Sequence, residues 1–397
     1  MQLPGDPLLT LANTATYTGA GITNIVQTLT GVLYWVYIDG NSDVVYRKST
    51  DGGRTWAQAT VVFAGTATAL AIWYDRWSGI AAGLIHMAYT ESVTDDTLYR
   101  TIDTESADAL STQTSIFAGL TTAAGGALSI TRARGGNVYC ATMIDAGAEG
   151  GFFRLPNANV PNGAWDAART TVFEGATSDQ VLLLPGWNAD NQDVMCVFWD
   201  ASVEELSLKR YDDSANSWAE TSIATGMTDT TAANSFRNMD AFCDLDNSRN
   251  VVAAWSATDA ANADLRCWVV NDTTITETST NIVLNSTDDQ GLLALSLDIL
   301  TGDWYAFYAG KSDGSETWGT ATNIYFKVST DDGATWGAET LLSNLASLTK
   351  LLNTPPRFSS AFGTPPCAIY YWGGISSAYV IPVLPPRPRT SYQAGVV

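Results

Sequence analysis

Seven segments of eight residues, predominantly apolar and rich in aromatic side chains, recur along this chain. They read "VLYWVYID" from residue 32, "LIHMAYTE" from 84, "VYCATMID" from 138, "VMCVFWDA" from 194, "VVAAWSAT" from 251, "WYAFYAGK" from 304 and "CAIYYWGG" from 367. Successive copies begin 52 to 63 residues apart, and each follows a stretch of turn-forming residues. Such runs, bounded by turns, predict strands buried on both faces. The chain is therefore an array of similar β units.

Each unit contains further strands. A third strand follows every octamer, from "DVVYRKS" to "SSAYVIP", and a fourth, such as "TVVFAG", closes most units. In the last unit the prolines of "VLPPRPRT" forbid a central strand, and the N-terminal "DPLLTLAN", about residues 6–13, fits the gap. The sequence thus predicts an all-β fold, a seven-bladed β-propeller of four-stranded antiparallel blades, closed by an N-terminal strand in the last blade. Six blades are the alternative.

Domain organisation follows from the repeats. We expect one propeller domain over residues 1–384 and an extended, Pro/Arg-containing C-terminal tail over residues 385–397. The start of the chain has neither a basic segment nor a long apolar one, so we expect no secretory signal, and no window approaches the ~20 apolar residues of a membrane span. The sequence predicts cytoplasmic synthesis and no membrane insertion.

Charge and composition exclude several classes of function. With 41 acidic and 20 basic residues the net charge is −21, which argues against nucleic acid or an anionic membrane as the partner. The single histidine, His86, argues against His-rich metal sites. Five cysteines, an odd number and far apart, predict buried free thiols rather than a disulfide framework or a zinc site.

One predicted turn occurs twice with nearly the same sequence. "STDGGRTW" (49–56) and "STDDGATW" (329–336) match the pattern Ser-x-Asp-x-Gly-x-Thr-Trp, and "YDDSANSW" (211–218) keeps Asp213 and Trp218 at the corresponding place. The pattern resembles the Asp-box, or BNR repeat, of sialidase-like β-propellers. In those propellers the box lies on the face opposite the catalytic pocket, so the resemblance implies a structural role.

The chemistry of this turn also favours a structural role. We expect the Ser and Asp side chains to accept hydrogen bonds from the turn's own backbone, the Gly to permit a positive φ, and the Trp to fill space between blades. The structural residues of the two boxes are Ser49, Asp51, Gly53, Thr55, Trp56, Ser329, Asp331, Gly333, Thr335 and Trp336.

Sialidase chemistry is the enzymatic alternative. The resembled enzymes hold the substrate carboxylate with three arginines, one of them in an F-R-I/L-P motif, and "FRLP" occurs here at Phe153–Pro156. It lies in a third strand of the third unit, not in the opening strand of the first blade. Basic residues occupy the same repeat position in five other units, at Arg47, Arg100, Lys209, Arg266 and Lys327. We therefore expect a ladder that pairs with neighbouring acids or extends along the blade surface with its charges in solvent, identify no arginine triad, and assign no catalytic residue.

The face opposite the boxes is predicted to be acidic. Loops between second and third strands carry many carboxylates against the one base Lys311, a charge that would repel a sialic acid. The arginines expected near the channel on that face are Arg237 and Arg357. A binding rim is predicted from Asp95, Asp96, Asp145, Glu149, Asp200, Glu204, Glu205, Asp264 and Trp318.

Cations are a further alternative for the acidic loops. "DLDNSRN" (244–250) and "ESVTDDT" (91–97) offer hard oxygen ligands of the kind that Ca²⁺ takes, although turn chemistry accounts for the first. No other cofactor is expected.

The function predicted from these features is non-catalytic. Low lysine content, Thr/Ala/Asn richness and a tail suited to docking are similar in composition to bacteriophage virion proteins. We expect a phage tail or capsid component, structural or binding host surface glycans, that contacts neighbouring protein subunits through its C-terminal tail and is located in the virion. The alternatives are a sialidase-like glycoside hydrolase and a cellular, cytoplasmic scaffold for protein interactions.

Overall fold

The structure is a computed structural model. It describes residues 9–10, 24–74, 83–119, 128–143, 150–168, 180–186, 192–200, 203–226, 239–244, 246–256, 263–271, 274–278, 282–285, 292–309, 323–344, 348–362, 366–372 and 377–382.

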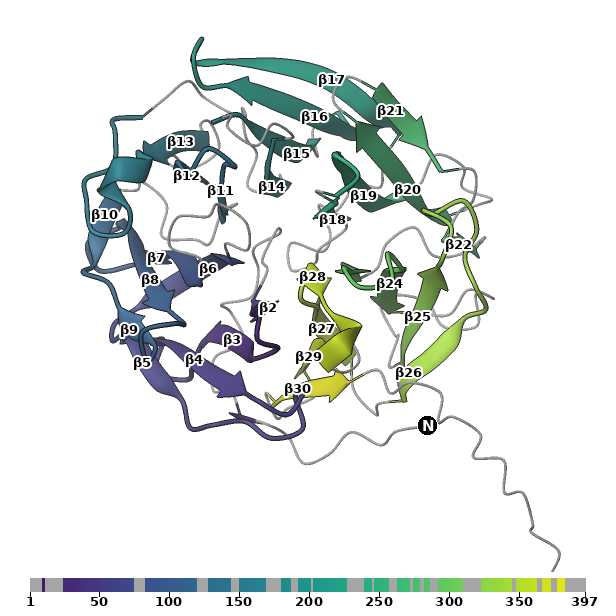
Figure 1. The fold of residues 1–397 in the computed structure, drawn as a ribbon, viewed down its shortest axis with the longest axis horizontal. Helices are drawn as coiled ribbons and strands as arrows, with labels where there is room; N and C mark the ends of the chain where they lie inside the picture. The colour runs from purple at the N-terminus through teal and green to yellow at the C-terminus, as the bar shows by residue number, and fades with distance from the viewer. Residues whose placement is uncertain are drawn as a thin grey trace, which may run out of the picture.

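The strands of these residues form seven sheets arranged in a ring, one blade for each repeat (Figure 1). The innermost strands of blades 1 to 7, numbered in chain order, are β2 (Ile25–Gln27), β6 (Ala67–Tyr74), β11 (Leu128–Arg132), β14 (Gln180–Pro185), β18 (Met239–Asp244), β23 (Leu293–Asp298) and β27 (Leu348–Asn353). No two of these sheets merge, as the six-bladed alternative would require. The predicted antiparallel β-propeller is confirmed.

Each recurring octamer forms the second strand of its blade, namely β3 (Leu33–Ile38), β7 (Leu84–Glu91), β12 (Val138–Met143), β15 (Val194–Asp200), β19 (Arg249–Ser256), β24 (Trp304–Ala309) and β29 (Pro366–Trp372). The third strands are β4 (Val44–Ser49), β8 (Thr97–Asp103), β13 (Gly150–Leu155), β16 (Glu205–Asp212), β20 (Ala263–Asn271), β25 (Asn323–Ser329) and β30 (Ser377–Pro382).

Outer strands complete the blades. They are β5 (Thr60–Phe63), β10 (Thr114–Phe117), β17 (Ser217–Thr225), β21 (Thr274–Glu277) with β22 (Val283–Asn285), β26 (Thr340–Asn344) and, in the last blade, β1 (Leu9–Thr10). Two short additions are β9 (Ala109–Leu110), which pairs with β8, and β28 (Arg357–Phe358), which pairs in parallel with β23. The short 3-10 helices η2 (Asn157–Asn159) and η4 (Ser360–Phe362) lie in loops. The fourth strand predicted for blade 3 falls outside the described residues.

Closure of the ring uses the two ends of the chain. The N-terminal strand β1 pairs antiparallel with β30, with Leu9 opposite Ala378 and Thr10 opposite Ser377. The segment predicted to complete the last blade therefore does so. Hydrogen bonding between the ends means that the ring cannot open without breaking this strand pair. The domain limits at residues 384 and 385 lie outside the described part of the chain and remain predictions.

The strand order defines two faces. In antiparallel blades the loops that join first to second and third to fourth strands lie at one end, which we call the clasp face because it carries the two Ser-x-Asp-x-Gly-x-Thr-Trp turns. Loops that join second to third strands, and the connections between blades, lie at the other end, which we call the rim face. Each later site is placed on one of these faces.

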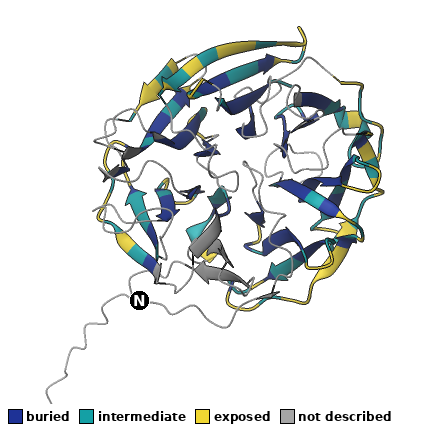
Figure 2. Ribbon diagram, turned by 180° about the vertical axis from the view of Figure 1, so that it is seen from behind, coloured by how far each residue is buried: buried dark blue, intermediate teal, exposed yellow. Residues whose placement is uncertain are grey.

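The core lies between neighbouring blades rather than inside one. Figure 2 shows buried residues on the inner strands and exposed ones mainly on the outer strands. One cluster joins Val36 and Ile38 of β3 to Ile85 and Met87 of β7, all fully or almost fully buried. The octamers are mostly apolar because both faces of the second strand pack against other blades. In the described part of the chain no helix is long and apolar enough to span a membrane.

Candidate functional site

The first clasp turn closes on itself through its own side chains. The Ser49 hydroxyl donates to Asp51 Oδ1 at 2.8 Å and accepts the Gly53 N–H at 2.9 Å. Asp51 also accepts the Thr55 N–H at 2.9 Å and the Thr55 hydroxyl at 2.6 Å. The Trp56 indole donates to the Gly53 carbonyl at 3.0 Å, and its ring meets Trp35 edge-on at 6.0 Å. Every conspicuous residue of the motif is thus engaged within the turn or in packing.

The second clasp turn repeats these contacts. Ser329 donates to Asp331 at 2.9 Å and accepts the Gly333 N–H at 2.8 Å, while Thr335 donates to Asp331 from its backbone and its hydroxyl. Gly53 and Gly333 have φ values of 90° and 79°, a region that favours glycine. Trp336 packs against the core between blades 5 and 6. The geometry accounts for both turns as folding elements.

Hydrogen bonding sets the ionisation of the two clasp carboxylates. Burial disfavours the charged form of Asp51, but hydrogen bonds from Thr55 and Ser49 outweigh it and lower its pKa to about 2. Hydrogen bonds from Thr335 likewise lower the pKa of Asp331. Both carboxylates are therefore ionised at neutral pH and unsuited to act as general acids.

The degenerate copy in blade 4 works differently from the prediction. Asp212, not Asp213, makes the local turn, accepting the Ser214 hydroxyl at 2.7 Å and the Ala215 N–H at 3.0 Å. Asp213 instead points to blade 3, where it accepts two hydrogen bonds from Arg154 at 3.0 Å and one from the Tyr139 hydroxyl at 2.8 Å. The motif predicts that Asp213 makes the turn, and this prediction is wrong: Asp212, one residue earlier, makes it.

The contact of Asp213 belongs to a set of inter-blade ion pairs that sequence reasoning missed. Asp108 of blade 2 accepts from Lys48 of blade 1, and also from the Tyr34 hydroxyl at 2.5 Å. Asp332 of blade 6 lies 2.5 Å from Arg249 of blade 5. In each case an aspartate of a third-to-fourth loop reaches the preceding blade on the clasp face. The available signal was the recurrence of Asp in that loop in alternate units.

The basic ladder of the third strands also serves the fold. Arg47 donates to the Tyr37 hydroxyl at 3.2 Å, and Arg100 donates to the Ser111 carbonyl at 2.9 Å and to the Val62 carbonyl.

The other members of the ladder behave alike. Lys209 pairs with Glu220 at 3.5 Å, Arg266 with Glu277 at 2.6 Å, and Lys327 donates to the Ile282 carbonyl at 2.7 Å. Arg154, the arginine of "FRLP", pairs with Asp166 at 2.6 Å besides Asp213. All these contacts join strands or blades. The pairing with acids that the ladder hypothesis predicts is seen at Arg154, Lys209 and Arg266, whereas the contacts described for the other three residues are to hydroxyl or carbonyl oxygens.

Arg357 does not lie on the face where we expected it. It belongs to β28, between the first and second strands of blade 7, and pairs in register with Leu297 at the clasp-face end of β23. The sequence indicated proximity to the channel but not which end, because the irregular segment after β27 has no repeat counterpart. Arg237 lies outside the described residues.

The predicted rim residues are spread over several blades. Asp96 accepts the Gly119 N–H at 3.1 Å, and Asp43 accepts the Gly65 N–H at 2.9 Å. These aspartates therefore fix the backbone just after the outer strands β10 and β5. Asp95 and Glu204 occupy turns with φ values of 57° and 54°.

The remaining rim residues do not form a described cluster with them. Asp200 and Glu205 face each other in strand register. Asp264 is placed by its backbone alone in β20, and Asp145, Glu149 and Trp318 lie outside the described residues. No group of three or more His, Cys, Asp or Glu side chains converges in the described part of the chain. Whether the rim binds a ligand remains a prediction.

The two candidate calcium loops use their carboxylates internally. Asp244 is buried, lies 2.9 Å from Arg249, and accepts the Asn247 amide at 2.8 Å. Glu91 accepts the N–H groups of Val93 and Thr94 at 2.8 Å. These contacts are those of turns, and they take up carboxylate oxygens that a cation would need.

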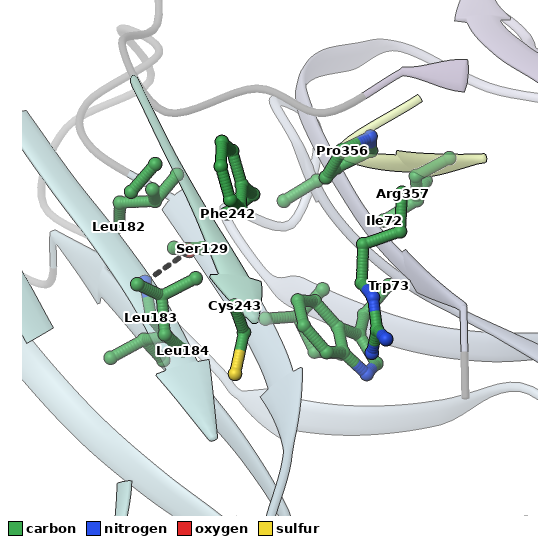
Figure 3. A pocket seen from close by; sticks show the side chains of 13 residues that line it. Ile72, Trp73, Ser129, Leu182, Leu183, Leu184, Phe242, Cys243, Pro356 and Arg357 are labelled. Atoms are coloured by element: carbon green, nitrogen blue, oxygen red, sulfur yellow. Dashed lines mark hydrogen bonds between the residues drawn. The ribbon is translucent and has the colours of Figure 1, made fainter. Parts of the chain in front are cut away.

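A narrow apolar pocket lies among the inner strands at the centre of the ring (Figure 3). The residues that line it include Leu182, Leu184, Phe242, Trp73 and Arg357. The room between the lining atoms suffices for about one water molecule, far less than a sugar ring needs.

Cys243, at the edge of this pocket, has its pKa raised to about 12 by burial, so its thiol stays protonated and unreactive. Cys140, Cys196 and Cys267 are also buried and free, as predicted.

Comparisons with other proteins reach the fold only. No protein-family model and no curated protein sequence matches the chain. Among solved structures, hydrazine synthase of Kuenenia stuttgartiensis is similar, with a TM-score of 0.55 and 11% identity over 96% of this chain and 98% of that one. An ulvan lyase of polysaccharide lyase family PL25 has a TM-score of 0.52 and 9% identity over 93% and 96%.

The intramolecular trans-sialidase from Ruminococcus gnavus is more distant, with a TM-score of 0.45 and 8% identity over 96% of this chain and 98% of that one. The likeness to the first two structures supports the β-propeller fold. At identities this low it assigns no chemistry, since unrelated functions share this architecture.

Proposed function

We propose that this chain is a non-catalytic β-propeller that works as a component of a virion, in a phage tail or capsid, as a structural element or by binding glycans on the host surface. The single observation that carries the non-catalytic part is the use of the third-strand ladder. Its arginines and lysines, the cations a sialidase-like site would draw on, make hydrogen bonds and ion pairs between strands and blades.

Arg154 shows why this use competes with catalysis. Its guanidinium holds Asp166 at 2.6 Å and Asp213 at 3.0 Å, on two blades at once. Binding a substrate carboxylate would require breaking both pairs, and the substrate would have to compensate for two partly buried carboxylates left without a cation. The assembly part of the proposal is supported by the low lysine content, by the Thr/Ala/Asn richness and by the Pro/Arg-containing tail.

Two experiments test the proposal. Incubation with fluorogenic sialosides and neutral glycosides, beside an active sialidase as control, should release no more fluorophore than buffer does. An antibody against the protein should label purified phage particles at a fixed copy number, and a glycan array then separates adhesion from structure. Hydrolysis that is lost on substituting one carboxylate would favour the glycoside hydrolase alternative. A protein that stays in the cytoplasmic fraction and never co-purifies with particles would favour the scaffold.

A further inference from the structure

Three exposed apolar side chains lie on first-to-second loops of adjacent blades on the clasp face. Leu29 of blade 1, Leu300 of blade 6 and Phe362 of blade 7 are 48%, 62% and 46% exposed. Single exposed apolar side chains are common on protein surfaces, but a group of them on one face marks an interaction site. We call these three residues the apolar triangle.

The loops that carry the triangle are fastened to one another. The buried Asp298 carboxylate accepts the N–H groups of Leu300 and Ser360, each at 3.0 Å, and so joins blade 6 to blade 7. The Gln27 side chain accepts the Ser359 N–H at 2.7 Å and joins blade 7 to blade 1. The triangle is therefore held in place before any partner arrives, which lowers the entropic cost of binding.

Close packing supports the same arrangement. The ring of Phe362 lies so near Gly31 that a Cβ there would come within 2.4 Å of it, and the loop of Leu29 donates its backbone N–H to the Tyr74 hydroxyl at 3.3 Å. These contacts hold the loops of Leu29 and Phe362 in the positions that leave both side chains exposed.

The described chain ends close to the triangle. β30 runs from the rim face to the clasp face and ends at Pro382, paired with Pro366. Phe362 is four residues before Pro366, so at most about 20 Å separates it from Pro382, from ~3.6 Å per residue and a strand spacing of ~5 Å. Residues 383–397, when extended, reach about 50 Å beyond Pro382.

The composition of that segment fits the triangle and its surroundings. It contains Arg387 and Arg389, no acidic residue, and apolar residues including Leu384 and Tyr392. Asp51 and Asp303 flank the triangle: Gly52, next to Asp51, faces the Phe362 backbone, and Asp303 shares the turn of Leu300. Basic side chains placed beside these two carboxylates would be attracted electrostatically.

Direction favours a second copy over the same chain. Prolines at 382, 385, 386 and 388 favour a stiff, extended segment that continues along β30, away from its own clasp face. We propose that the apolar triangle binds residues 383–397 of a second copy of this chain. The inference rests on the proposed function only in taking the protein to work in an assembly.

The test measures self-association of the full chain by light scattering after size exclusion, from low micromolar to the highest soluble concentration. Wild type should associate in a concentration-dependent way. Leu300→Ser with Phe362→Ser should weaken association at least about tenfold, as should Arg387→Glu with Arg389→Glu. Val93→Ser with Val203→Ser removes two apolar residues of the rim face that are 74% and 59% exposed, and should leave association unchanged.

A synthetic peptide of residues 383–397 should dissociate the wild-type assembly, and a scrambled peptide should not. Leu300→Ser alone serves if the double variant melts at a lower temperature, because Leu300 is the most exposed of the three. The proposal is overturned if the wild type is monomeric at every concentration, or if it associates and neither the tail variant nor the triangle variant weakens that association. Neither result bears on particle labelling, so the two proposals fail separately.

Discussion

Arg154 of blade 3 donates two hydrogen bonds, each 3.0 Å long, to the carboxylate of Asp213 in blade 4. The two side chains are partly buried, 23% and 15% exposed. A charge pair in such a place fastens one blade to the next, and removing one member leaves the other short of a partner.

Asp213→Asn should therefore lower the free energy of unfolding by about 1–3 kcal/mol. Chemical denaturation monitored by tryptophan fluorescence checks this. Glu220→Gln is the matched control, since its pair with Lys209 lies within one blade and Glu220 is half exposed; its cost should stay below about 1 kcal/mol. Equal effects of the two substitutions would show that the inter-blade position has no special weight.

Gly333 should tolerate no side chain. Its φ is +79°, and a Cβ there would lie 2.5 Å from the Trp304 ring. Gly302 has nearly the same φ, +81°, with nothing within 4 Å of such a Cβ. Gly302→Ala should cost about 1–2 kcal/mol from backbone strain alone, and Gly333→Ala about 1–3 kcal/mol more from overpacking. Equal losses in thermal unfolding would mean that the Trp304 contact is absent.

His86 should make the fold sensitive to mild acid. It is completely buried, 2.7 Å from the Tyr99 hydroxyl, and burial, with the nearby Arg132 charge, holds its pKa well below the ordinary 6.5. Below pH 6.5 the unfolded chain binds a proton at His86 that the folded chain does not. The free energy of unfolding therefore decreases as the pH is lowered, by up to about 1.4 kcal/mol per pH unit. As this is the chain's single histidine, denaturation between pH 7 and 5 isolates it.

The comparison variant for this titration is His86→Gln. It should lose much of the pH dependence between 6.5 and 5 while carboxylates remain ionised. A variant whose stability falls with acid as steeply as that of wild type would rule out His86 as the cause.

Asp51 governs a lower pH range. Its pKa in the folded protein is about 2, against 3.8 ordinarily, so its contribution is complete above about pH 4 and is lost as pH falls towards 2. Asp51→Asn should be less stable than wild type at pH 5, by at most about 1 kcal/mol because the side chain is only partly buried, and should melt at a lower temperature. The difference should narrow towards pH 2. A constant gap between the two melting curves would contradict the hydrogen-bonded clasp.

The architecture could be predicted from the sequence because it is written in local patterns. Mostly apolar octamers such as the one that begins at Val194 form second strands because their composition and flanking turns favour no other structure. The prolines after Pro382 showed that the last blade lacks an outer strand, which Leu9 and Thr10 supply. Clasp turns were predictable for the same reason, since Ser49 and Asp51 bond within eight residues.

Contacts between blades were not predictable in this way. Lys48 and Asp108 are 60 residues apart, and Arg154 and Asp213 are 59 apart, so their meeting depends on how far a loop reaches across an inter-blade gap. Asp212 makes the turn, whereas Asp213, the next residue, contacts blade 3. Which of the two makes the turn cannot be predicted until the strand register is known.

The central claim is that the basic ladder holds the propeller together and binds no substrate. Arg154→Gln measures it directly, with unfolding free energy and hydrolysis of fluorogenic sialosides and neutral glycosides read on the same preparation. The account predicts a less stable protein and, for wild type and variant alike, no release above buffer. A wild type that hydrolyses a glycoside, with activity lost in an equally stable variant, would contradict it.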